Sequence, residues 1–175
     1  QDRLWYGPEG GQFSLYFGQG QDQTLANWIV PAPFNQGGFE VLERSDRRVH
    51  LRAPVRLTNA SGNTLDTRID RTIGLVARAE AGRLLGVDIP AGVQYLGLMS
   101  INQVTNQGRD PLTEQTGTCS IWILSMFPTT QHTWVIAPYR KSGGGPELIT
   151  NYFGDIPADR FKLLPEAGAG LLRAD

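Results

Sequence analysis

Cysteine, histidine and lysine are scarce in this chain of 175 residues. The single cysteine, Cys119, excludes an internal disulfide and a thiolate-rich zinc site. Two histidines, His50 and His132, leave little material for a histidine metal centre. Neither sign of charge is in excess, because 16 Lys and Arg face 17 Asp and Glu. The sequence therefore predicts no metal and no cofactor, and it gives no electrostatic argument for nucleic acid or an anionic membrane as a partner.

Long apolar runs and the motifs of common enzymes are also missing. No run approaches the ~20 residues of a membrane helix. The glycines at 143–145 lack the Lys-Ser/Thr pair of a phosphate-binding loop, and neither G-x-S-x-G nor H-E-x-x-H occurs. Cys119 stands in an apolar strand pattern, which favours a buried, inert thiol over a nucleophile. His132 precedes a strand, where it could act as an acid or base or simply be exposed.

Turn residues, by contrast, are abundant: 21 Gly and 11 Pro punctuate short β patterns. The clearest strand runs from Leu65 to Ile73, where apolar and polar residues alternate. The pattern predicts one short helix at 79–85 and strands at 3–7, 12–17, 39–43, 48–52, 54–58, 64–78, 95–106, 117–127 and 133–137. The first two strands are expected to pair with each other, 39–43 with 48–52, and 54–58 with 64–78 across the turn at 59–63. The strand at 117–127 is expected to be buried on both faces. The fold class is therefore all-β, an antiparallel β-sandwich.

The two ends do not taper into polar residues. The chain opens on an aromatic strand pattern, Leu4-Trp5-Tyr6, and stops just after Leu171-Leu172. We expect either a single domain over residues 1–175 or the central segment of a larger sandwich, incomplete at both ends. Such a segment would bury its uncovered strands against the missing parts of its own domain or a second copy.

A first candidate site surrounds the turn at 8–11. Arg3 and Trp5 share one face of the opening strand, and Glu9 and Gln12 lie at the turn that follows. Flat aromatic faces stack on the C–H surfaces of sugars, while Arg, Glu and Gln side chains bind hydroxyl groups. The alternative interpretation is an aromatic core edge with a bracing ion pair.

A second candidate site lies near the end of the chain. Asn151 opens this segment, and Asp159 and Arg160 follow a proline turn. The Asp–Arg pair could brace the turn, or the guanidinium could face a ligand. We predict that Arg3, Glu9 and Arg160 line one polar pocket and carry any catalysis. The predicted ligand-binding residues around them are Trp5, Gln12, Trp122, Asn151 and Asp159.

Four stretches, 2–13, 25–28, 117–127 and 151–160, are similar to an uncharacterised bacterial family of the galactose mutarotase-like superfamily. The resemblance implies a β-supersandwich, two large antiparallel sheets with a sugar-binding groove on a concave face, in proteins longer than this chain. It also implies a bacterial source, and it leaves the compartment open, periplasmic and extracellular included, because no targeting segment is present in this sequence.

Aldose epimerases of that superfamily use a histidine acid and a glutamate base at the anomeric carbon. Here the turn Asn106-Gln107-Gly108 resembles the turn before the histidine, but Trp122 occupies that general region, and the glutamate would fall beyond Asp175. The resemblance thus implies a domain that binds a carbohydrate or a similar small polar ligand, of unknown activity. Two alternatives stay open: a sugar-active isomerase, lyase or hydrolase, and a structural sandwich module that binds nothing.

Overall fold

The computed structural model describes residues 2–140 and 154–174. Strands make up 41% and helices 9% of these residues, and every sheet is antiparallel. The predicted all-β, antiparallel, sandwich-like fold is therefore confirmed. Residue contacts divide the chain into two compact units, Gln1–Ser125 and Met126–Asp175, which we describe separately. The single domain over 1–175 stays a prediction.

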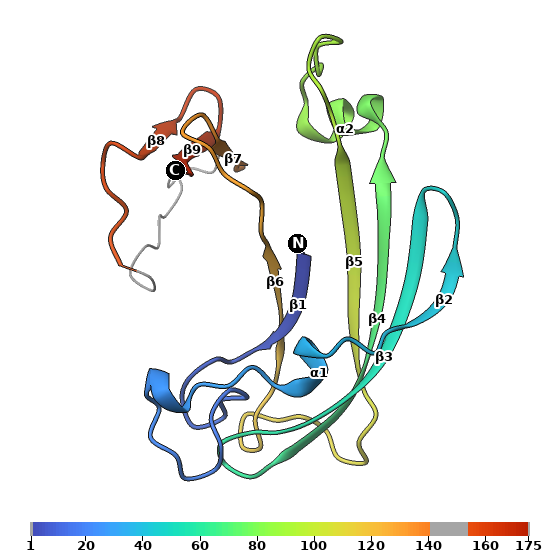
Figure 1. Ribbon diagram of the computed structural model, residues 1–175, viewed down its shortest axis with the longest axis vertical. Helices are drawn as coiled ribbons and strands as arrows, with labels where there is room; N and C mark the ends of the chain where they lie inside the picture. Colours follow the sequence, from blue (N-terminus) through green and yellow to red (C-terminus); the bar gives the residue numbers. More distant parts are fainter. Residues whose placement is uncertain (1, 141–153, 175) are drawn as a thin grey trace. The chain divides into compact units, whose positions relative to one another are not determined.

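The first unit is built on a long, curved sheet of four strands in the order β2-β3-β4-β5 (Figure 1). Their bounds are Glu40–Arg44 for β2, Arg48–Thr58 for β3, Thr64–Val76 for β4 and Gly97–Asn106 for β5. The predicted pairs 39–43 with 48–52 and 54–58 with 64–78 are confirmed. The two predicted strands 48–52 and 54–58 form one strand, β3. Pro54 is tolerated inside it because β2 pairs with β3 only as far as Arg52.

The alternating pattern of β4 gives the sheet two chemically different faces. Leu65, Thr67 and Ile69 are buried on what we call the inner face, while Arg68 and Asp70 lie on the outer face. This confirms the interpretation of the alternation as a half-buried strand. His50 lies on the outer face, opposite to Val49 and Leu51.

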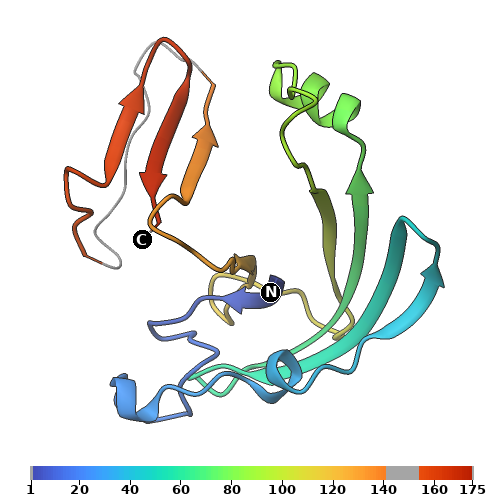
Figure 2. The same ribbon diagram turned by 45° about the horizontal axis from the view of Figure 1, so that its top comes forward.

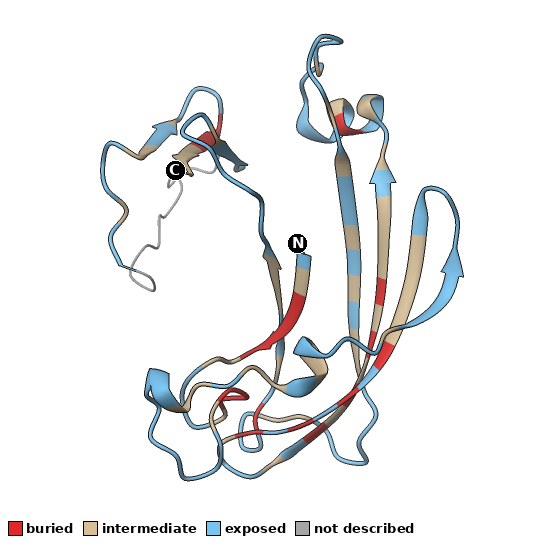
Figure 3. Cartoon of the chain, viewed as in Figure 1, coloured by how far each residue is buried: buried red, intermediate tan, exposed pale blue. Residues whose placement is uncertain are grey.

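A second layer covers part of the inner face. It consists of β1 (Asp2–Gly7) and β6 (Ser120–Ser125), which pair with each other. Leu4 and Tyr6 of β1 belong to one buried cluster with residues of β3 and β4, namely Val55, Leu57, Leu65 and Ile69. The buried residues concentrate where these layers meet, whereas much of β2 and β5 is exposed (Figure 3).

Two strand predictions around this layer are wrong. Residues 12–17 do not pair with β1, because a tight turn carries the chain back on itself: Ser14 N donates to Gly11 O and Leu15 N to Pro8 O. The strand at 117–127 forms only as β6 and is not buried on both faces, since Ile121 is 39% exposed. Within the described part of the chain β6 has β1 as its single partner, so it lacks the neighbours that would bury it.

Helices are few and short. The predicted helix at 79–85 is confirmed as α2 (Arg78–Leu85), and it ends at Gly86, whose φ of 69° suits glycine. A 3₁₀ turn at Leu25–Asn27 and the single-turn α1 at Ala32–Asn35 were not predicted. None of the helices in the described ranges has the length and apolar character needed to cross a bilayer.

The second unit holds a three-stranded sheet in the order β7-β9-β8 (Figure 2). Its strands are β7 (Trp134–Pro138), β8 (Phe161–Leu164) and β9 (Ala169–Arg173). The prediction of a strand at 133–137 is confirmed, while β8 and β9 were not predicted. A Cβ built on Gly170 of β9 would lie 3.3 Å from the ring of Phe161 on β8. A larger residue at this point would require the Phe161 ring to shift by a few tenths of an ångström.

Candidate ligand-binding cavity

A cavity of about 330 Å³ lies in the first unit, on the inner face of the large sheet. It is bounded by the start of β1, the segment around α1, and inner-face residues of β3 and β4. The residues that line it are Asp2, Arg3, Leu4, Pro33, Phe34, Asn35, Gly37, Phe39, Leu51, Arg71 and Ile73. This volume falls within the range of small-molecule sites in proteins.

Arg71, on β4, is one of the charged residues that line this cavity. It stands in the alternating series of the inner face and is only 4% exposed. One Nη atom donates to the carboxylate of Asp2, and the other oxygen of that carboxylate accepts a hydrogen bond from Ser125 Oγ at 2.7 Å. Arg71 Nε is buried and has no hydrogen bond partner among the described residues. A buried cation with a donor left over favours an anionic or strongly accepting neighbour.

Arg3 and two phenylalanines complete the chemistry of the cavity. The guanidinium carbon of Arg3 lies 6.0 Å from the centre of the Trp5 ring. Phe34 reaches the site because the Pro-initiated turn of α1 carries it over β1, where its ring meets Tyr6 edge-on at 5.1 Å. Phe39 comes from the residue before β2. The cavity therefore combines the Arg71 guanidinium, the Asp2 carboxylate and aromatic rings, while the Arg3 side chain shares the face of β1 that carries Trp5.

The predicted aromatic residues Trp5 and Trp122 do come together, but in a core cluster. They are register partners across β1 and β6, and their rings meet edge-on at 5.6 Å. Tyr16 and Trp28 stack on each other at 5.6 Å and join the same cluster. Trp5 is 7% exposed, and neither it nor Trp122 is among the residues that line the Arg3 cavity.

Glu9 and Gln12 lie at the turn after β1, as expected. The carboxylate of Glu9 accepts a hydrogen bond from Trp28 Nε1 at 2.8 Å, and its carbonyl accepts one from Ser14 Oγ. The Gln12 carbonyl accepts a hydrogen bond from Ser61 Oγ at 2.7 Å, while its side chain is exposed. Glu9 thus braces the aromatic cluster and does not line the cavity that contains Arg3.

The second predicted site lies in the second unit. Arg160 donates from Nε and Nη2 to the carbonyl of Arg173, at 3.2 and 3.0 Å, and Asp159 pairs with the Arg173 guanidinium at 3.3 Å. These contacts are those of the bracing interpretation. Asn151 lies outside the described residues. Because Arg3 and Arg160 belong to different units, their convergence on one pocket stays a prediction.

Sequence reasoning missed the residues that share the cavity with Arg3. A signal was present for Arg71, because this arginine interrupts an otherwise uncharged buried series on β4. A charged residue at a core position needs a partner, which turns out to be Asp2. Phe34 and Phe39 gave no such signal, since irregular segments carry them to the cavity.

A polar cluster on the outer face centres on Asp70. Its carboxylate accepts hydrogen bonds from Arg52 Nε and Arg68 Nε at 2.7 Å each, and His50 Nε2 lies 3.6 Å away. Burial acts to raise the pKa of Asp70, but these arginine hydrogen bonds outweigh it and hold the pKa below its usual range. Both oxygens of the Asp70 carboxylate are engaged by arginines of the same sheet face, which is typical of a structural network.

In the described ranges the candidate metal ligands are scattered and the single thiol is half-buried. No group of three or more His, Cys, Asp or Glu side chains is placed there to hold a metal ion. Cys119 is half-buried, and burial raises the pKa of its thiol, which disfavours the thiolate.

Comparison with known families places this chain without assigning it an activity. The chain belongs to a family of unknown function, DUF6786, whose profile matches residues 1–175. No curated protein and no solved structure matches the chain. Membership therefore covers the whole sequence, and the chemistry of the cavity is the guide to function.

Proposed function

We propose that this chain is a carbohydrate-binding domain of the galactose mutarotase-like type, and that the cavity beside Arg3 and Arg71 holds the ligand. The observation that carries the proposal is the composition of this cavity. It places the Arg71 guanidinium and the Asp2 carboxylate beside two phenylalanine rings, on the inner face of a curved sheet, with Arg3 also in its lining. The resemblance of the sequence to that superfamily supports the same assignment.

Each group in the cavity suits one part of a sugar. Guanidinium N–H groups donate to hydroxyl, ring and carboxylate oxygens, and the Asp2 carboxylate accepts from hydroxyl groups. The faces of Phe34 and Phe39 offer apolar surface to C–H groups. Arg71 is held by Asp2 before any ligand arrives, so its orientation is preorganised and little entropy is lost on binding.

Binding receives more support than acid–base catalysis. The carboxylate that lines the cavity is Asp2, which is engaged by both Arg71 and Ser125. The predicted catalytic carboxylate, Glu9, bonds Trp28 instead. A general base needs a carboxylate within reach of the proton that it removes. The geometry of this cavity therefore favours recognition.

The test is a calorimetric titration of the protein with a panel of monosaccharides, neutral aldoses and uronates, in parallel with Arg71→Lys, which keeps the charge and loses the planar guanidinium fork. We expect saturable binding of at least one sugar and a loss of about tenfold or more in affinity for the variant, because a charge-assisted hydrogen bond is removed. Arg83→Gln, on the exposed surface of α2, is the matched control and should bind like the wild type.

Two outcomes would contradict the proposal. Binding to no sugar by a folded protein would support the structural-module alternative. Catalysed mutarotation of a free aldose, measured by polarimetry, would support the enzyme alternative, and its loss in Glu9→Gln would return the catalytic role to Glu9.

A further inference from the structure

A second cavity continues the first along the same sheet face. It has a volume of about 460 Å³ and lies under the β2–β3 turn. Its floor is apolar and comes from inner-face residues of four strands, Val41, Val49, Ile73, Leu75 and Leu98. Ile73 also lines the Arg71 cavity, so the two hollows adjoin at this residue. Both lie entirely within the first unit.

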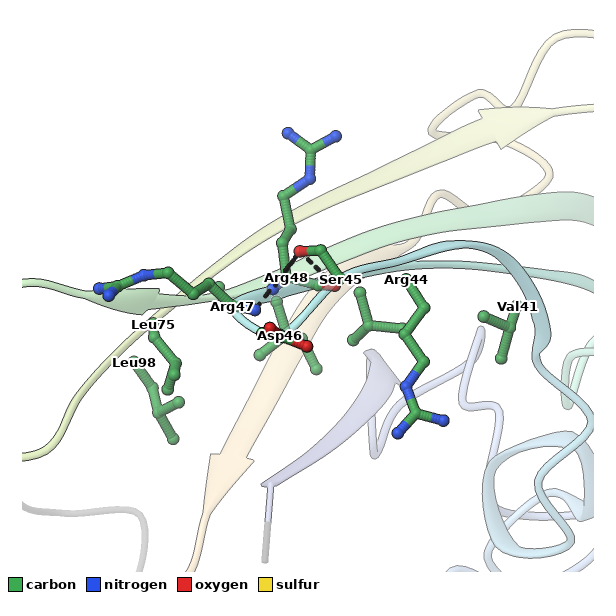
Figure 4. A pocket seen from close by; sticks show the side chains of 11 residues that line it. Val41, Arg44, Ser45, Asp46, Arg47, Arg48, Leu75 and Leu98 are labelled. Carbon is green, nitrogen blue, oxygen red and sulfur yellow. Dashed lines mark hydrogen bonds between the residues drawn. The ribbon is translucent and has the colours of Figure 1, made fainter.

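Arg44 gives the second cavity a cation of its own. Figure 4 shows its side chain leaving β2 on the same side as Leu75 and Leu98, while Arg48 points to the other side. Arg48 pairs with Glu43 at 2.8 Å. No ion pair or side-chain hydrogen bond engages the Arg44 guanidinium within residues 2–140 and 154–174. The cavity thus combines an apolar floor with the Arg44 guanidinium, and its lining also includes Asp46, Arg47 and Arg48 from the turn.

The spacing of the two cations follows from the register. Leu51 faces Arg71 and Val49 faces Arg44, so the arginines lie two residues apart along the strands and two strands apart across the sheet. Strand geometry puts their backbones roughly 12 Å apart. Arg71 lines one cavity and Arg44 the other, and the two cavities share Ile73; we call these two adjoining cavities the groove.

We propose that the ligand is an acidic oligosaccharide, with one carboxylate-bearing unit at Arg71 and the next along the groove at Arg44. This inference rests on the proposed carbohydrate binding and adds the class and length of the ligand. Guanidinium groups favour carboxylates because they bind both oxygens through a planar fork. The apolar floor at Leu75 and Leu98 faces the C–H surface of a ring, and Leu98 is 58% exposed and available for such contact.

The experiment measures affinity against ligand length and charge. The probes are galacturonate, digalacturonate and trigalacturonate, together with the methyl esters of the two oligomers, which keep the shape and lose the charge. We expect affinity to rise about tenfold or more from the monomer to the oligomers and to fall for the esters. We also expect binding of the acids to weaken in 0.5 M NaCl, since salt screens exposed charges.

Arg44→Gln tests the second position, with Arg83→Gln, on the exposed surface of α2, as its control. Arg44→Gln should remove the gain from length and leave the affinity for galacturonate unchanged, whereas Arg83→Gln should change neither. Equal affinity for all lengths, equal affinity for acids and esters, or an unchanged profile in Arg44→Gln would overturn this inference while sugar binding itself stands. Loss of self-association in Arg44→Gln, seen by sedimentation, would assign the groove to a second copy instead. Binding of no saccharide at all would overturn the proposed function together with this inference.

Discussion

The hydroxyl groups of Tyr6 and Thr67 lie 3.1 Å apart and join the two layers of the first unit. Thr67 donates to the carbonyl of Val55 at 3.0 Å, so Tyr6 is the donor to Thr67. Tyr6 is fully buried, and this burial raises the pKa of its phenol to about 12. One short chain of hydrogen bonds thus connects β1 with β4 and β3 through the core.

This relationship predicts a loss of stability at high pH. Between pH 10 and about 12 the unfolded chain gives up the Tyr6 proton while the folded chain keeps it, so the free energy of unfolding falls as pH rises. The fall attributable to Tyr6 is about 2–3 kcal/mol across that window. Tyr6→Phe lacks this component, and urea unfolding at pH 8 to 11.5 should show the wild type losing stability relative to the variant. Parallel curves for the two proteins would contradict the prediction.

A second prediction concerns the free energy of unfolding at low pH, and it depends on Asp70. Because its pKa is lowered in the fold, its contribution to stability is complete above the unfolded pKa near 4 and is lost as pH falls through the folded value. Asp70→Asn should lower the free energy of unfolding at pH 7 by about 1–3 kcal/mol and flatten its decline below pH 4. Asp66→Asn is the control, because Asp66 pairs with an exposed Arg56 at 3.8 Å and should change little. Equal losses for Asp66→Asn and Asp70→Asn in chemical denaturation would refute a special role of the Asp70 cluster.

The large sheet could be predicted because its determinants are local. The alternation from Leu65 to Ile73 and the turn at 59–63 are both readable within a few residues, and both are found as expected. The partner of β1 could not be read in this way. Residues 12–17 and 117–127 both carry strand-like patterns, and the choice between them depends on where the turn after Pro8 sends the chain.

The candidate site likewise combines a residue that could be found from a local pattern with residues that only the fold brings together. Arg3 was found because it stands beside aromatics near a turn, and it lines the cavity. Arg71 and Asp2 are 69 residues apart in sequence, and only the packing of β1 over β4 brings them together. Glu9 was chosen from the sequence because a carboxylate can act as an acid or base. Its hydrogen bond to Trp28 could not be predicted, because residues 12–28 follow an irregular path that has no periodic pattern.

Two substitutions distinguish a bracing role of Glu9 from a catalytic or binding role. Glu9→Ala removes the acceptor of the Trp28 indole N–H, and we expect a loss of about 1–2 kcal/mol in the free energy of unfolding. Glu9→Gln keeps an acceptor oxygen, so most of that stability should remain. Thermal unfolding of both variants measures the difference. If Glu9→Gln instead abolished sugar binding at an unchanged melting temperature, the catalytic or binding role predicted from the sequence would be supported over the bracing role.

Gly117 lies in the loop before β6, at the point where this loop packs against Asn59 and Phe13. Its φ is 95°, and a Cβ built there would lie 2.8 Å from Asn59 Nδ2 and 3.0 Å from Phe13 Cγ. Asn59 cannot move away cheaply: it is 1% exposed, it donates to the Thr116 carbonyl at 2.9 Å, and it accepts from two amides of its own turn.

Gly117→Ala therefore combines two costs, the positive φ and the overpacking against Asn59 and Phe13, each about 1–3 kcal/mol. Gly11→Ala is the matched control, because Gly11 has a φ of 84° but nothing within 4 Å of the added Cβ, so it carries the first cost alone. We expect chemical denaturation to show Gly117→Ala as clearly less stable than Gly11→Ala, and the difference should persist at every pH. Equal destabilisation would mean that Asn59 and Phe13 relax freely, and that the contact between this loop and the turn at 59–63 is not a fixed part of the fold.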